Sequence, residues 1–131
     1  MPKLILCEFG KIETILDPST NSLISDDNFR KKYIGEVGFI SIYESQNKAP
    51  GKKFAHFDTE YKYLHTSAGD LLVQDDGCKL STKNSVYHFK FGDFGLSVID
   101  KVRIKLSAFG IDGLDEKERE ILKKSLWEDK I

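Results

Sequence analysis

Three side chains that could perform acid–base or metal chemistry alternate along one short stretch. His56, Asp58 and Glu60 are spaced two residues apart. Alternate side chains of a β-strand point to the same face, so an extended segment would bring an imidazole and two carboxylates together. His65 is a candidate further ligand from a neighbouring strand. Imidazole combined with carboxylates suits a divalent ion of intermediate hardness. This cluster is therefore a candidate metal site for a hydrolase-type domain.

The interpretation we favour for this stretch is structural. A strand with a polar outer face and Phe57 and Tyr61 on its inner face would show the same alternation. Neither a pair of histidines at helical spacing nor a Cys-x-x-Cys anchor accompanies the cluster. Metal-assisted hydrolysis is therefore the alternative hypothesis, and we expect no cofactor.

Acidic and aromatic side chains are interleaved in the middle of the chain. Tyrosine is favoured at protein interfaces because its ring buries a large area while its hydroxyl keeps a hydrogen bond. Carboxylates around such a ring would steer a basic partner toward it. The predicted partner-binding residues are Asp58, Glu60, Tyr61, Asp75 and Asp76. The competing interpretation is that the aromatic residues form the core and the acidic residues end loops.

Composition limits the class of protein. The 131 residues carry 20 basic and 21 acidic side chains, for a net charge of −1, and 40% are hydrophobic. These values predict a single globular domain over residues 1–131. No apolar run approaches the roughly 20 residues of a membrane span, and we expect no membrane partner. Near-neutral charge and scarce arginine argue against a nucleic-acid partner.

The two cysteines, Cys7 and Cys78, match no metal or redox spacing. We expect both to be reduced thiols in a cytoplasmic protein, because disulfides are rare in that compartment. A disulfide between them is the alternative.

Hydrophobic periodicity and turn residues predict a series of β-strands. Gly10 is expected to turn the chain between the first two, and Asp76-Gly77 to form a hairpin turn with positive φ angles. Alternation of Val102, Ile104 and Leu106 with basic residues predicts a final strand with one solvated face. The predicted strands are 3–9, 11–16, 36–43, 54–58, 60–66, 71–74, 85–91 and 96–106.

Two helices are expected. Ser25 is a candidate cap for a short helix over 26–33. Asp115 and Glu118 form an acidic capping box for a C-terminal helix over 115–129, and Trp127 could anchor it to a sheet. The predicted fold is α+β: a mainly antiparallel meander with these two helices, the C-terminal one on its apolar face. A barrel-like closure of the sheet is the alternative.

These observations favour binding over catalysis. The expected function is that of a small non-catalytic protein that occludes a site on a macromolecular partner, most concretely a basic protein. A bacterial toxin-immunity protein or a similar inhibitor is the form we expect, since such proteins need only a rigid sheet and complementary charge. The oligomeric state does not follow from the sequence.

Overall fold

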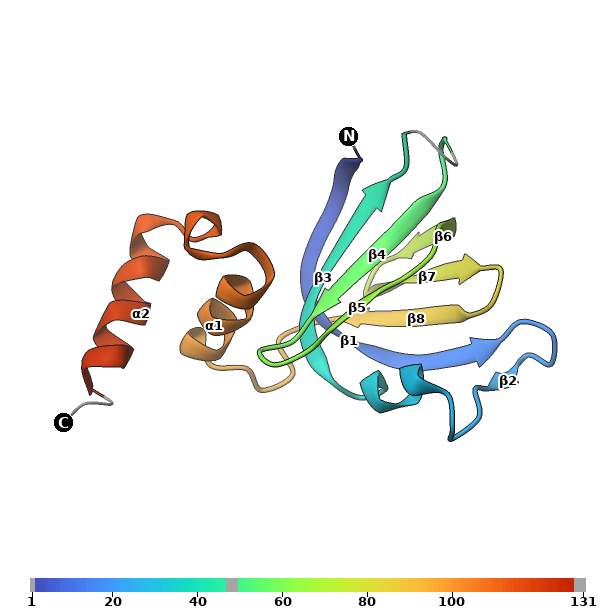
Figure 1. Ribbon diagram of the computed structural model, residues 1–131, viewed down its shortest axis with the longest axis horizontal. Coiled ribbons are helices and arrows are strands. Elements are labelled where there is room, and N and C mark those ends of the chain that lie inside the picture. The colour runs from blue at the N-terminus through green and yellow to red at the C-terminus, as the bar shows by residue number, and fades with distance from the viewer. Residues whose placement is uncertain (1, 47–49, 129–131) are drawn as a thin grey trace.

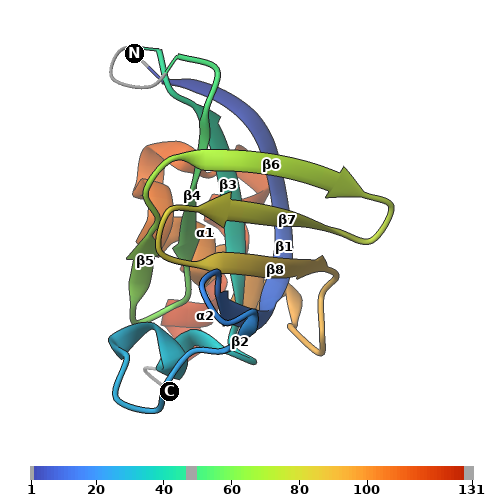
Figure 2. The same cartoon turned by 90° about the vertical axis from the view of Figure 1, so that its right-hand side faces the viewer.

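The chain forms an eight-stranded antiparallel sheet followed by two C-terminal helices (Figure 1). The computed structural model describes residues 2–46 and 50–128, without the side chains of 126–128. The sheet curls on itself, because β1 pairs with β3 along its first half and with β8 along its second half. Figure 2 shows β6, β7 and β8 crossing in front of β1, β3 and β4, so that the closed sheet forms two facing layers. The α+β class with a mainly antiparallel sheet is therefore confirmed.

The strands follow one another around the ring in the order β2-β1-β3-β4-β6-β7-β8, and β5 pairs with β4. Their bounds are β1 Lys3–Asp17, β2 Ser22–Leu23, β3 Val37–Glu44, β4 Lys53–Asp58, β5 Tyr63–His65, β6 Gly69–Gln74, β7 Gly77–Thr82 and β8 Val86–Phe91. The helical elements are the 3-10 helices η1 Phe29–Tyr33 and η2 Ile111–Gly113 and the α-helices α1 Val98–Phe109 and α2 Glu116–Glu128.

β1 runs unbroken through Gly10, where the sequence predicted a turn. At this residue the strand pairs with Gly38 of β3 on one side and Phe91 of β8 on the other. A Cβ atom on Gly10 would lie 2.3 Å from the Lys90 carbonyl oxygen. This is too close for any residue that has a side chain, so the position requires glycine. Gly10 thus permits the close strand approach that closes the ring, and it does not reverse the chain.

The inward side chains of the ring form the main hydrophobic core. Ile40 and Ile42 of β3, Phe57 of β4 and Tyr87 of β8 are at most 1% exposed. Cys78 belongs to this core, whereas Cys7 on β1 is only partly buried. Both are free thiols, as predicted.

The short helix near residues 26–33 is a 3-10 helix that begins later than predicted, at Phe29. The Asn28 side chain, and not Ser25, caps it by accepting a hydrogen bond from the Arg30 amide at 2.9 Å. The Ser25 hydroxyl instead donates to Asp27. Because Asn28 and not Ser25 provides the cap, the helix begins at Phe29 and not at residue 26.

The hairpin between β6 and β7 is present, but its predicted geometry was wrong. Gln74 pairs with Gly77, so Asp75 and Asp76 form the turn and Gly77 belongs to β7. None of these three residues has a positive φ angle. A Cβ atom on Gly77 would lie 2.1 Å from the Phe89 carbonyl oxygen of β8. This glycine is required by close strand packing and not by the turn.

The predicted strand over 96–106 is wrong, because this segment forms α1. Ser97 and Asp100 make a capping box at its start. Val102 and Leu106, one turn apart, pack toward α2, while the buried Ile104 faces a cleft that Val37 of β3 also lines. A helix covered on two sides has apolar residues on both faces, which imitated the two-residue period of a strand.

The C-terminal helix is confirmed, together with its capping box: the Glu118 amide donates to Asp115 at 2.7 Å and the Asp115 amide donates to Glu118 at 3.1 Å. Its expected position on the sheet was wrong. Leu122 packs with Val102 in a second, smaller cluster, and Figure 1 shows α1 between α2 and the sheet. The Trp127 side chain lies outside the described residues. Within the described residues, no helix combines the length and apolar character needed to cross a membrane.

Candidate binding surface

Five ring-bearing side chains gather on the outer face of β3, β4 and β5. Four consecutive contacts connect them, with centroids 5.4 Å apart for Tyr43–Phe54, 5.0 Å for Tyr43–His56, 3.7 Å for His56–His65 and 4.9 Å for Tyr63–His65. We call Tyr43, Phe54, His56, Tyr63 and His65 the ring cluster. It presents planar, partly exposed groups on a rigid sheet.

Strand register and alternation produce the ring cluster. Tyr43 is the cross-strand partner of Phe54, and His56 is the partner of His65. Along β4, Phe54 and His56 point outward while the intervening Ala55 is fully buried in the core. Cross-strand partners have closely spaced Cβ atoms, so their rings meet.

Partial burial shifts the pKa values of two groups on this face, His56 and Asp58. Partial burial lowers the pKa of His56, and the neighbouring His65 lowers it further because two imidazolium ions would repel each other. Burial raises the pKa of Asp58, and His65 opposes that rise. Both effects favour the neutral form of the His56 imidazole.

The geometry of the histidine pair does not converge on one ion. The His56 and His65 rings are nearly parallel, with 13° between their planes. Ring nitrogens bind metals through lone pairs that lie in the ring plane, so parallel rings direct those lone pairs alongside each other. Among the described residues, which include His56, Asp58, Glu60 and His65, no group of three His, Cys, Asp or Glu is placed to hold a metal ion.

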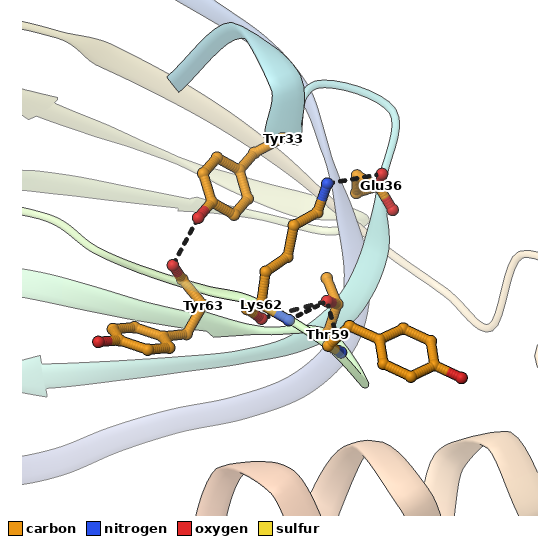
Figure 3. A network of polar contacts seen from close by, with 6 residues as sticks. Tyr33, Glu36, Thr59, Lys62 and Tyr63 are labelled. Carbon is orange, nitrogen blue, oxygen red and sulfur yellow. Dashed lines mark hydrogen bonds and ion pairs between the residues drawn. The ribbon is translucent and has the colours of Figure 1, made fainter. Parts of the chain in front are cut away.

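The β4–β5 turn carries Tyr61 and leads directly into Tyr63 of the ring cluster, and Figure 3 shows the contacts that hold this turn. The Thr59 hydroxyl accepts hydrogen bonds from the amides of Tyr61 and Lys62, at 3.3 and 3.1 Å. The Tyr33 hydroxyl donates to the Tyr63 carbonyl at 2.7 Å, and Lys62 pairs with Glu36 at 3.0 Å. This bracing holds the turn against η1 and the start of β3.

Tyr61 is 90% exposed, so the interpretation that placed it on the inner face with Phe57 was wrong for Tyr61 and correct for Phe57. β4 ends at Asp58, and the alternation of the strand does not continue into the turn. Glu60 lies in the same turn and is partly buried.

The five residues predicted to bind a partner do not form one surface. Asp58, Glu60 and Tyr61 lie at the end of β4 and in the turn after it. Asp75 and Asp76 form the β6–β7 turn, and Figure 2 shows that turn on the opposite side of the molecule from β5. Their proximity in the sequence suggested one surface, but the closed sheet places the two groups on opposite sides of the molecule.

The sequence prediction of a partner surface missed Tyr43, Phe54, Tyr63 and the role of the two histidines as stacked rings. Tyr43 is more than ten residues away from the other members, and only the β3–β4 register brings it to them. The period-two spacing of Phe54 and His56 was the available signal. Comparison with protein-family models, with curated proteins and with solved structures finds no match for this chain.

Proposed function

We propose that this protein is a small, non-catalytic binding protein that covers a site on a basic protein partner. A toxin-neutralising immunity protein or a similar inhibitor is its concrete form. The ring cluster and the adjoining β4–β5 turn are the proposed contact surface. The observation that carries the proposal is the uncovered ring cluster on a rigid sheet face.

The ring cluster suits protein recognition for energetic reasons. Rigid aromatic side chains bury much area at little cost in conformational entropy, and they dominate many interface hot spots. Tyr63 is 65% exposed and Tyr61 is 90% exposed. Both are held by backbone contacts of the turn, so a partner would meet a preorganised surface.

The charges beside the ring cluster favour a basic partner. Lys53 and Lys62 are neutralised within the protein by Glu44 at 3.5 Å and Glu36 at 3.0 Å. Asp58 and Glu60 take part in none of the ion pairs found among the described residues. These two carboxylates, at the end of β4 and in the turn after it, would accelerate encounter with a cationic surface.

The test is affinity capture from the extract of cells that produce the protein, with two charge variants compared. Asp58→Asn with Glu60→Gln removes two carboxylates from the proposed surface. Asp75→Asn with Asp76→Asn removes two from the remote hairpin. We expect one stoichiometric basic protein to be captured by the wild type and by the hairpin variant. The surface variant should bind it at least about tenfold more weakly, chiefly through slower association.

A second pair of variants tests the rings. Tyr61→Ser with Tyr63→Ser should abolish capture, while Leu72→Ser with Val73→Ser, which changes two exposed apolar residues of β6, should not. Equal capture by all four variants would refute the proposed surface. A wild-type bait that captures no protein would refute the proposed function.

A further inference from the structure

A cleft of about 460 Å³ lies between the β4–β5 turn and α1. Its apolar lining comes from Val37 of β3, from Leu96 just before α1, and from Ile104 of α1. Tyr61 from the turn also lines it. Figure 3 shows the turn with the helices beside it. The cleft therefore combines apolar side chains with one exposed aromatic ring, that of Tyr61.

The walls of this cleft are fixed. The turn is held through Thr59 and Lys62, whose backbone amide and carbonyl groups bond to each other at 2.9 Å. On the other wall, Asp100 belongs to the capping box of α1, and one of its carboxylate oxygens accepts from the Ser97 amide at 3.1 Å. These hydrogen bonds order both walls, which would lower the entropic cost of binding a ligand.

The charge of the cleft is negative. Glu36, Glu60 and Asp100 contribute carboxylates, and Lys62 is the single cation among the described lining residues. Lys62 is already paired with Glu36 and lies over the Tyr33 ring, 5.3 Å from its centroid. The Ser97 hydrogen bonds lower the pKa of Asp100, which keeps that carboxylate ionised. Arg103, one turn further along α1, donates to Ser125 of α2 at 3.0 Å, and its positive charge also lowers the pKa of Asp100.

From this combination we infer that the cleft receives an arginine side chain of the protein partner, an inference that rests on the proposed function. The aliphatic part of arginine would pack on the partly exposed Val37 and Leu96, with Ile104 beneath them. Its planar guanidinium would stack on Tyr61 and bond to Glu60. The rigid fork of arginine fits a planar ring beside a carboxylate, whereas the strongly hydrated ammonium of lysine fits it less well.

The test uses the intact protein and small probes, so its outcome does not depend on finding the partner. N-acetyl-arginine amide is titrated into isotope-labelled protein, and the amide signals of Tyr61, Asp100 and Ile104 are followed by NMR. N-acetyl-citrulline amide is the matched probe, with the same shape and no charge. We expect the arginine probe to shift these signals and the citrulline probe to bind about fivefold more weakly.

Glu60→Gln is the matched variant, because it keeps the shape of the side chain in an accessible turn. It should weaken binding of the arginine probe about threefold and leave the citrulline probe unchanged. N-acetyl-lysine amide is titrated in the same way and should bind more weakly than the arginine probe. The inference would be overturned if the citrulline or the lysine probe bound as tightly as the arginine probe, or if the arginine probe shifted only signals elsewhere in the protein. Those results would leave the capture experiment of the proposed function unaffected, so the two failures are distinguishable.

Discussion

His56 and His65 stack across the β4–β5 pair with their ring centroids 3.7 Å apart and 13° between their planes. The stack joins two strands of different length, since β4 has six residues and β5, which pairs with it, has three. Tyr43 and Phe54 flank it on one side and Tyr63 on the other, and Asp58 follows on the same face. Protonation of this pair would place two positive charges in contact, so its energy depends on pH.

The first prediction concerns this pH dependence. Burial lowers the pKa of His56 from 6.5, so the unfolded chain takes up a proton first as the pH falls. His56 therefore contributes stability above its ordinary pKa, and this contribution is lost as the pH falls toward the folded-state pKa. Asp58 acts in the opposite sense at more acidic pH, because its pKa is raised. Urea unfolding of the wild type between about pH 8 and 6 should show lower stability at the acidic end, and His56→Asn should reduce this slope.

The His65→Asn variant supplies the control, since it removes the neighbouring charge without removing His56. Its NMR titration should show the pKa of His56 moving up toward the ordinary value. A His56 pKa that is unchanged by this substitution would contradict the role given to the stack.

The second prediction compares two aromatic side chains that the sequence placed on the same strand face. Phe57→Ala should cost about 3–5 kcal/mol of unfolding free energy, because Phe57 is fully buried in the ring core. Tyr61→Ala should change it by less than about 0.5 kcal/mol, because that side chain is 90% exposed. Denaturant titration of both variants measures the difference. Similar losses for the two would mean that Tyr61 is not on the surface.

Gly10 carries the third prediction. Gly10→Ala should destabilise the fold by about 1–3 kcal/mol, because the new methyl group would meet the Lys90 carbonyl and force β1 and β8 apart. Glu13→Ala, at an exposed position of the same strand, is the control and should have little effect. Thermal or chemical unfolding would distinguish them. A Gly10→Ala protein as stable as the control would show that the strands do not approach this closely.

The fourth prediction concerns the thiols. Cys78 is 2% exposed and burial raises its pKa to about 12, so it should be inert to a thiol reagent in the native protein. Cys7 is partly exposed, and although burial raises its pKa as well, it should react slowly. We expect one thiol to react in buffer and two in guanidinium chloride. The Cys7→Ser variant should show no native reaction, and reaction of a thiol in that variant would contradict the buried position of Cys78.

Local patterns predicted much of the sheet. The alternation in 36–43 and 85–91 correctly identified β3 and β8, and their inward residues Ile40, Tyr87 and Phe89 are in the core. The capping box of Asp115 and Glu118 correctly identified α2. These features depend on neighbours within a few residues, so the sequence alone is sufficient to predict them.

The closure of the ring, the position of the helices and the composition of the binding surface depended on long-range contacts. Gly10 is compatible with a turn or with a crowded strand, and only the approach of β8 decides between them. Val102, Ile104 and Leu106 have the spacing of a strand, but α1 is covered by the sheet on one side and by α2 on the other.

By itself the sequence predicted the positions of β3, β4 and β8 and the start of α2, because side-chain period and capping chemistry act locally, whereas it predicted no strand where β7 lies. Only the tertiary structure decided that Tyr43 joins His56, that His65 stacks on it, and that Asp75 and Asp76 lie far from Asp58. The physical reason is that strand register fixes cross-strand neighbours, and register is set by the packing of the entire ring.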